Sequence, residues 1–365
     1  MKNITVRIIV IFLVVMSCAV TMNAQVKQQL RGEIEKIIRY DTEIDERKIP
    51  GLTIAVLDHD SIYYYGYGTV DKSKDVLPDE HTIFEIGGLT KIFTASLVSI
   101  LDGEGILKKD TTVNTYLSEF ERNKNNFNPT LRALLTHTSG LGQLPDNFGE
   151  HEKIPENPFA FYSQKDLFDF YRNLSVGKNK EGKYVYSHVG YAILERVVTN
   201  AMKKSFVDVM REKLLRPLDL SETKFFLPDS LRTVMAQGYN RAGEATPAWR
   251  YNSFSGAMGL KSTAFDLVKF LQAHMEEERF AKMQIPYANT GFDKKSFAGE
   301  GWHLLKRRKY FVVTAIGVTK GYRAFVAFVK ATKTGVVVLS NSTNSHDNLG
   351  MLILKMLNRN CRRNQ

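Results

Sequence analysis

Side chains that can transfer protons occur in two short segments of the chain. Lys91 closes the segment Gly87-Gly88-Leu89-Thr90-Lys91, and Tyr186 and His188 lie in Tyr186-Ser187-His188. Amine, phenol and imidazole groups serve as general acids and bases when their environment brings their pKa close to the working pH. Taken singly, a tyrosine is more often a core residue and a lysine a surface residue, so these residues have to be judged together with their surroundings.

Metal and phosphate chemistry find little support in the sequence. The eight histidines show no HExxH motif and no paired ligand spacing, which argues against a zinc hydrolase. The segments Gly66-Tyr67-Gly68 and Gly87-Gly88 have neither the Walker spacing nor the dinucleotide-binding fingerprint. We therefore expect no metal and no cofactor.

Strand-like segments lie at both ends of the chain. After Pro50, two β-branched or aromatic runs at 51–57 and 62–68 flank the turn Asp58-His59-Asp60-Ser61, which predicts a β-hairpin. The C-terminal part adds further strand-like runs and then an amphipathic helix, in the order 310–314, 322–329, 335–339 and 348–357. The two ends are expected to share one antiparallel sheet.

The middle of the chain has helical periodicity. Between about 90 and 280, apolar residues recur at helical spacing, for example in the run Ile92, Ala95, Leu97, Val98 and Leu101. Strands at both ends and helices between them predict an α+β architecture in one large domain. The sheet part is expected at about 49–85 and 290–357, and the helical part at about 88–285.

The first 24 residues have the features of a secretory signal peptide. Lys2 and Arg7 precede an apolar run at 8–16, and Ala24 offers a cleavage site. We expect an exported, periplasmic or extracellular protein without a transmembrane helix after signal removal. A second interpretation makes Cys18 a lipidation site. The mature chain then divides into a domain at 25–357 and a basic tail at 358–365, with Cys361 unable to form an internal disulfide.

The chain is basic, with a formal net charge of +11 and a pI near 9.4. Its lysines and arginines are dispersed rather than clustered, and the signal peptide directs the protein away from nucleic acid. We expect no nucleic-acid partner and favour a basic protein near anionic polymers of the cell envelope. The pattern specifies no oligomeric state.

Five segments follow one another in the order of a known family. They are Phe84-Glu85-Ile86-Gly87-Gly88-Leu89-Thr90-Lys91, Leu134-Leu135-Thr136-His137-Thr138-Ser139-Gly140-Leu141, Tyr186-Ser187-His188-Val189-Gly190-Tyr191, Pro217-Leu218-Asp219-Leu220 and Gly259-Leu260-Lys261-Ser262-Thr263-Ala264. Together they resemble the serine β-lactamase-related family of class C β-lactamases, penicillin-binding proteins, D-alanyl-D-alanine carboxypeptidases and esterases. The resemblance runs from about Ile49 to Asn341 and implies a β-lactamase/transpeptidase-like fold.

The resemblance places Gly88 where the family has its nucleophilic serine. In the family's Ser-x-x-Lys motif the serine and the lysine lie one helical turn apart. The resemblance implies that Lys91 accepts a proton beside the reacting group and that Tyr186 relays a proton to the leaving group. Gly88 has no side-chain atom that can carry an acyl group, and the hydroxyls of Thr90 and Ser96 lie elsewhere on the helix.

Two further positions depart from the family pattern. His188 stands where the family has asparagine, so a titrating imidazole replaces an amide. The family's third motif, a lysine or histidine followed by a polar residue and glycine, aligns with Ala315-Ile316-Gly317, which keeps only Gly317. By resemblance, the backbone amides of Gly88 and Val318 still form an oxyanion hole, with Ala315 and Gly317 beside it.

These departures imply a catalytically impaired protein that binds a peptide-like, acyl or cell-wall ligand in the former active-site cleft. The alternative is a hydrolase of β-lactams, D-amino-acid peptides or esters. It would act through attack by water, or Gly88 would be a substitution of the active serine. A third interpretation is an envelope scaffold that binds its partner through the basic surface.

Overall fold

The computed structural model describes residues 24–41, 44, 47–149, 157–177 and 180–359. Apart from Ala24, the expected signal peptide lies outside these ranges, and so do Cys18, Cys361 and the rest of the tail beyond residue 359. The chain divides into two units at Ile44. In the first unit, residues 24–41 are helical and end in the π-helical turn Ile37–Asp41. Within the described ranges, no helix combines the length and apolar character needed to cross a membrane.

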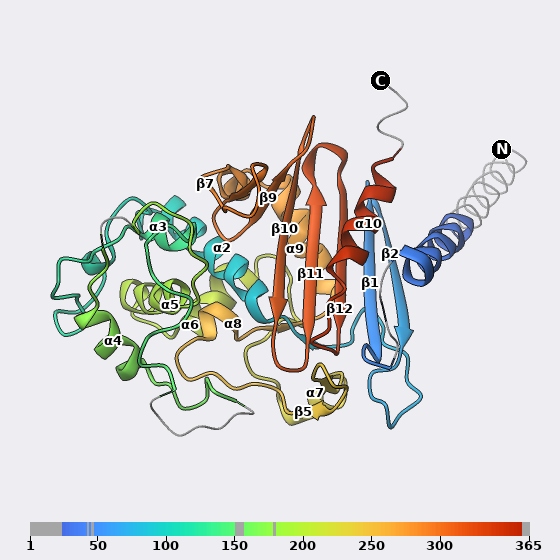
Figure 1. The fold of residues 1–365 in the computed structure, drawn as a ribbon, viewed down its shortest axis with the longest axis horizontal. Coiled ribbons are helices and arrows are strands. Elements are labelled where there is room, and N and C mark those ends of the chain that lie inside the picture. Colours follow the sequence, from blue (N-terminus) through green and yellow to red (C-terminus); the bar gives the residue numbers. More distant parts are fainter. Residues whose placement is uncertain (1–23, 42–43, 45–46, 150–156, 178–179, 360–365) are drawn as a thin grey trace, which may run out of the picture. The chain divides into compact units, whose positions relative to one another are not determined.

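In the described part of the second unit, eight strands form one antiparallel sheet (Figure 1). N-terminal β1 pairs with C-terminal β12, with Ile54 opposite Val338, so the two chain ends do share a sheet, as predicted. Across the sheet the strands run β2 (Ser61–Gly68), β1 (Gly51–Asp58), β12 (Thr334–Ser340), β11 (Arg323–Val329), β10 (Phe311–Val318), β9 (His303–Lys306), β8 (Ser296–Ala298) and β7 (Ala288–Asn289).

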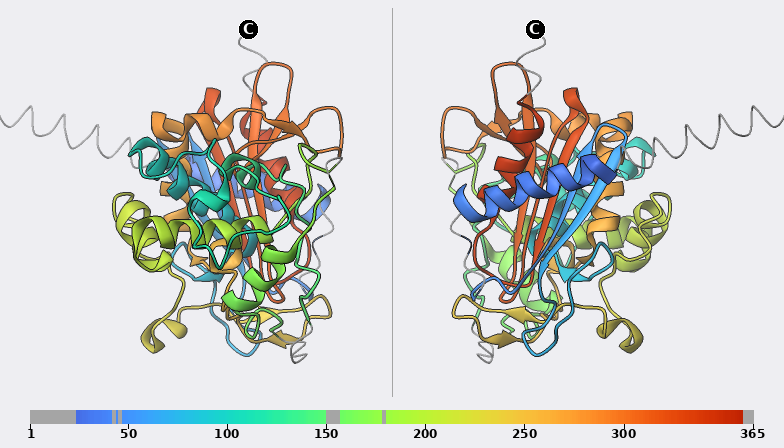
Figure 2. Two further views of the ribbon diagram at one scale, coloured as in Figure 1. Left: turned by 90° about the vertical axis from the view of Figure 1, so that its left-hand side faces the viewer. Right: turned by 90° about the vertical axis from the view of Figure 1, so that its right-hand side faces the viewer.

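The central strands are buried on both faces. Along β11, Val326 and Phe328 belong to the main core, whereas Phe325 contacts Gly350 of α10 (Asp347–Leu357). This alternation follows from the two-residue period of a strand. Helix α9 (Ala264–Glu276) packs on β12 and β1 from the side of the main core, and Figure 1 shows α9 behind the sheet and α10 in front of it. Figure 2 shows the same three layers, α10, the sheet and α9, from two other sides.

Helix α2 (Thr90–Gly103) runs through the core beside the sheet. Every residue from Thr90 to Leu101 is buried, as expected for a helix that is enclosed on all sides. Phe93 stacks on Phe270 of α9, with ring centroids 4.0 Å apart. The other helices of this region are α3 (Leu131–Leu135), α4 (Gln164–Asn173), α5 (Val189–Met202), α6 (Phe206–Met210), α7 (Asp229–Arg232) and α8 (Ser255–Met258).

Two glycines let the start of α2 approach strand β10. Gly87 begins the short 3₁₀ turn Gly87–Leu89 with φ of 46°, and a Cβ there would lie 2.8 Å from the carbonyl oxygen of Val318. A Cβ on Gly317 would lie 1.8 Å from the carbonyl oxygen of Ile86. Only glycine is compatible with such close backbone contact, and with positive φ at Gly87. Gly87 and Gly317 therefore allow residue 88 to lie directly against β10.

The structure extends two expectations from the sequence. Strand β10 continues to Val318, well beyond the predicted end at Thr314, because its last residues pair with β11, with Val318 opposite Arg323. The middle region is helical as expected but also contains two small sheets. These pair β3 (Phe84–Glu85) with β6 (Lys261–Ser262), and β4 (Gly238–Tyr239) with β5 (Ala245–Thr246).

Candidate active site

Residue 88 lies in the 3₁₀ turn between β3 and α2 and is buried. A Cβ added to Gly88 would lie 3.0 Å from Oη of Tyr186 and 3.1 Å from the carbonyl oxygen of Ile316. These contacts are tight, but the phenol end of a tyrosine can move by a few tenths of an ångström. A side chain at this position would therefore point between Tyr186 and β10.

Lys91 follows one helical turn later and is 2% exposed. Its Nζ lies 2.8 Å from Nδ1 of His188 and donates to the carbonyl oxygen of Ala257 at 3.1 Å. The same nitrogen lies 4.9 Å from the ring centroid of Tyr186. Burial lowers the pKa of Lys91 well below its ordinary value, because an ammonium is costly to remove from water. The environment thus favours a neutral amine, the form that accepts a proton.

His188 precedes the first residue of α5 and is 8% exposed. Its backbone amide donates to the carbonyl oxygen of Gln143 at 3.0 Å, and its ring lies between Lys91 at Nδ1 and the side-chain amide of Gln143 at Nε2. Burial first, and then the neighbouring Lys91 and His137, lower the pKa of His188 well below its ordinary value. The ring is therefore neutral at neutral pH. Either the amine of Lys91 donates a hydrogen bond to Nδ1, or a protonated Nδ1 donates to the amine.

Tyr186 lies between Gly88 and the imidazole rings of His137 and His188. Its ring lies at 5.3 Å from His188 and 4.7 Å from His137 between centroids, while its Oη borders Gly88. Burial raises the pKa of Tyr186, so the phenol keeps its proton at neutral pH and acts as a hydrogen-bond donor. The structure thus brings together Gly88, Lys91, Tyr186 and His188.

The strand side of the site has no charged group at the family's motif positions. Ala315 is 5% exposed and belongs to the main core, whereas Ile316 is 39% exposed. Gly317 and Val318 follow on the same strand and lie against Gly87 and Leu89. The predicted oxyanion segment is therefore adjacent to residue 88, but the position expected for a cation carries only a methyl group.

Two hydroxyls near Gly88 in sequence are committed elsewhere. Thr90 Oγ1 accepts from the backbone amide of Leu260 at 3.1 Å, and Ser96 Oγ donates to the carbonyl oxygen of Ile92 at 2.6 Å. Both side chains are fully buried. Neither replaces a serine at position 88, which agrees with the expectation from helical spacing.

Sequence reasoning missed His303 and its neighbour Tyr184. His303 on β9 accepts from, or donates to, Oη of Tyr184 at 2.7 Å, and its ring stacks on Tyr186 with centroids 6.4 Å apart. Burial, and to a lesser degree Lys91, lower the pKa of His303 to about 4. His303 lies more than a hundred residues from Tyr186 in sequence and in none of the family segments, so only the fold reveals it.

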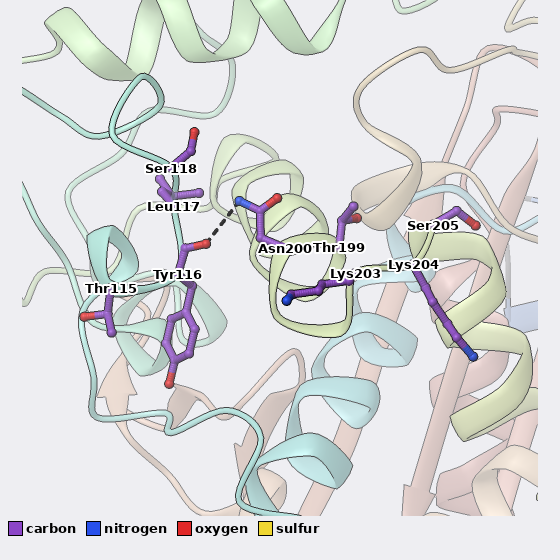
Figure 3. A pocket seen from close by; sticks show the side chains of 9 residues that line it. All are labelled: Thr115, Tyr116, Leu117, Ser118, Thr199, Asn200, Lys203, Lys204 and Ser205. Carbon is purple, nitrogen blue, oxygen red and sulfur yellow. Dashed lines mark hydrogen bonds between the residues drawn. The ribbon is translucent and has the colours of Figure 1, made fainter.

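Other possible sites are separate from this cluster. Among the described residues, no group of three histidine, cysteine or acidic side chains could hold a metal ion. A cavity of about 570 Å³ lies between the loop after α2 and the end of α5 (Figure 3). Its Asn200 already donates to the carbonyl oxygen of Tyr116 at 3.1 Å. A second cavity of about 490 Å³ is lined by Val207 and Phe226, among others. None of the predicted site residues lines either cavity.

A large antiparallel sheet, a helical region beside it and a buried lysine one turn after residue 88 define a β-lactamase/transpeptidase-like fold. A solved structure described as a β-lactamase/D-alanine carboxypeptidase from Pseudomonas syringae superposes with a TM-score of 0.77 at 21% identity, covering 90% of this chain and 99% of that one. A class C β-lactamase structure also gives 0.77, at 22% identity, covering 92% and 96%.

The sequence comparisons give the same assignment. The sequence model of the family described as Beta-lactamase matches residues 28–357. A β-lactamase of Providencia stuartii is 30% identical over 252 residues, which cover 68% of this chain and 61% of that protein. A β-lactamase of Psychrobacter immobilis is 23% identical over 347 residues, which cover 83% of this chain and 84% of that protein. The chain belongs to the β-lactamase family.

Proposed function

We propose that this protein is an impaired member of the β-lactamase family that binds a peptide-like or acyl ligand reversibly and forms no acyl-enzyme at residue 88. The observation that carries this proposal is the absence of a side chain at Gly88, in a turn whose neighbouring hydroxyls at Thr90 and Ser96 already have partners. Acyl transfer in this family needs a hydroxyl that becomes covalently attached. Without it, what remains is binding.

The surrounding groups support recognition of a carbonyl compound. Tyr186 presents a protonated phenol beside Gly88. The resemblance implies in addition an oxyanion hole formed by the backbone amides of Gly88 and Val318. Lys91 and His188 form a hydrogen-bonded pair behind the tyrosine. Such donors stabilise a carbonyl oxygen whether or not a bond is formed to its carbon.

The expected signal peptide at 1–24 supports an exported protein in the periplasm or outside the cell. Lipidation at Cys18 is the alternative form of the same proposal, since it would anchor the mature chain to a membrane. Mass spectrometry of the protein from its native host separates the two forms: a mature N-terminus after Ala24 supports release, and a lipid on Cys18 supports anchoring.

The test of reversible binding uses the mature protein and a fluorescent penicillin. We expect no fluorescent band after denaturing electrophoresis, together with a concentration-dependent rise in melting temperature caused by ligand binding to the folded state. A covalent adduct on a residue of the site would overturn the proposal. Absence of any thermal shift with penicillins, D-alanyl peptides and short esters would equally contradict it.

A second candidate function is hydrolysis by direct attack of water. Its support is the retained polar set, because Oη of Tyr186 borders the space of the missing side chain and Lys91 is hydrogen-bonded to His188. A water there would lose its proton to the amine while its oxygen attacks the carbonyl carbon. The tetrahedral intermediate would then break its bond to the leaving group, which takes up that proton. Hydrolysis above background that falls in both Lys91→Ala and Tyr186→Phe would favour this candidate. Activity unchanged by both substitutions would reject it.

A further inference from the structure

The strand that borders Gly88 carries neither a cation nor a polar side chain where the family pattern has both. Ile316 is 39% exposed, and its carbonyl oxygen lies 3.1 Å from the position of a Cβ on Gly88. Ala315 ends in a methyl group and is buried in the main core. Neither side chain can pair with a ligand carboxylate, and a carboxylate removed from water without a partner is strongly disfavoured.

Aromatic rings continue from Gly88 toward the surface. Tyr186 stacks on His303, His303 contacts Tyr184, and Tyr184 meets Phe292 edge-on, with ring centroids 6.4, 6.0 and 6.1 Å apart. We call these four residues the aromatic row. They come from the segment before α5, from β9 and from the turn between β7 and β8. Three distant segments thus meet to form one row.

The outer end of the aromatic row is open. Phe292 is 76% exposed, so it contributes little to the core. A single exposed aromatic residue needs no explanation on a protein surface. Phe292, however, continues a row that begins at residue 88, and aromatic rings are favourable contact surfaces for other rings at 4.5 to 7 Å.

The imidazole in the aromatic row does not supply a positive charge. Burial lowers the pKa of His303 to about 4, with Lys91 contributing in the same direction. The ring is therefore neutral at pH 7, and its partner is the phenol of Tyr184 at 2.7 Å. The row can stack on an aromatic group but offers no counter-ion to an acid.

We propose that the site selects an uncharged carbonyl compound that carries an aromatic group, with the carbonyl at Gly88 and the aromatic group along the aromatic row. This inference rests on the proposed function, because it specifies the ligand of the same site. It differs from the expectation for a β-lactam or a cell-wall peptide, both of which carry a free carboxylate.

A matched pair of probes tests the inference. Benzylpenicillin and its methyl ester share the same ring system and phenyl group but differ in one negative charge. Calorimetric titration of the mature protein should give at least about tenfold tighter binding of the ester, since each 1.4 kcal/mol changes affinity tenfold. Equal or tighter binding of the acid would overturn the inference and leave the proposed function intact. If neither compound binds, the inference fails, and the proposed function fails with it only when D-alanyl peptides and short esters also give no thermal shift.

Substitutions on the strand test the role of charge. Ala315→Lys restores the cation of the family pattern at its own position, and urea unfolding shows whether this buried position tolerates the lysine. We expect this variant to bind the acid more tightly than the wild type does and to lose its preference for the ester. Leu77→Lys, at a residue that is 57% exposed on the loop after β2, controls for overall charge. An unchanged preference in a folded Ala315→Lys variant would contradict the inference.

A substitution at the open end tests the aromatic row. Phe292→Ala should weaken binding of the methyl ester about three- to tenfold, the range expected for losing one aromatic contact. Phe120→Ala is a matched control, because Phe120 is 79% exposed and lies in the loop after α2. Equal affinities of the Phe292→Ala variant and the wild type would remove the aromatic row from the site.

Discussion

Lys91 and Lys109 are both buried, yet their amines have different partners. Lys109 is 4% exposed, and its Nζ donates to Oε2 of Glu300 at 2.7 Å and to Oγ of Ser99 at 2.8 Å. Lys91 is 2% exposed and contacts an imidazole and a carbonyl oxygen. No carboxylate of the described residues lies within ion-pair distance of it. Lys109 therefore fits a structural ammonium, and Lys91 does not.

This difference indicates why Lys91 is present. A buried ionised group is normally paired, because removal from water costs several kcal/mol. A lysine that is buried without a counter-ion gains little stability for the fold, and its lowered pKa is typical of a group used in proton transfer. The environment of Lys91 thus suits the proposed role in proton transfer, although residue 88 has no side chain.

The largest expected effect distinguishes the two lysines by chemistry. In a Gly88→Ser background, Lys91→Met should slow phosphonylation of the introduced serine by a fluorophosphonate, with release of fluoride, at least about 100-fold, because loss of a general base costs 10² to 10⁴ in rate. Lys109→Met in the same background should lower the labelling rate only in proportion to the fraction of protein that is unfolded. Equal labelling rates of the Gly88→Ser protein with and without Lys91 would show that this amine takes no part.

The next effect concerns the structural lysine. Glu300→Gln should reduce the free energy of unfolding by about 3 to 5 kcal/mol, because it weakens the pairing of buried Lys109 and of Arg132, whose Nη1 lies 2.6 Å from Oε1 of Glu300. Urea unfolding measures this loss. Glu104→Gln is the control, since Glu104 and Lys213 form a partly exposed pair worth under about 1 kcal/mol. Similar losses in both variants would remove the distinction.

His303 provides a pH-dependent test of the same site. Its pKa is lowered to about 4 in the folded protein, against 6.5 in the unfolded chain, so the unfolded state binds the proton first. Its contribution to stability should therefore fall by up to about 3 kcal/mol as the pH decreases from 6.5 to 4. His303→Gln should flatten this part of the pH profile relative to the wild type. Profiles that coincide would contradict the lowered pKa.

The smallest expected effect is the stability of the Lys91 variant itself. Lys91→Met removes two hydrogen bonds but also removes an amine that is costly to bury. We expect the free energy of unfolding at pH 7 to change by less than about 1 kcal/mol, as measured by urea unfolding. A loss of 3 kcal/mol or more would make Lys91 a structural residue like Lys109.

Much of the site could be predicted from sequence because its parts lie in short local motifs. Gly88 and Lys91 share one helix start, Tyr186 and His188 share another, and their order along the chain carried the resemblance. The α+β fold followed from strand-like segments at both ends, and the comparisons confirmed it. The roles of these four residues remain predictions.

Other features could not be predicted because they arise only from tertiary contacts. His303 reaches Tyr186 through the pairing of β9 with β10, which no local pattern encodes. The partner of Lys91 was equally hidden, since the 2.8 Å contact with His188 joins α2 to the start of α5 across 97 residues of chain. The open end at Phe292 depends on where the turn after β7 lies.

Intact-protein mass spectrometry after exposure to a fluorophosphonate tests most directly whether a proton-transfer site persists without its nucleophile. The wild-type mass should stay unchanged, whereas Gly88→Ser should gain one adduct on residue 88. Gly88→Ala, which adds the same Cβ but no hydroxyl, should remain unlabelled. An adduct on a site residue of the wild-type protein, or a Gly88→Ser protein that folds but stays unlabelled, would contradict this interpretation of the site.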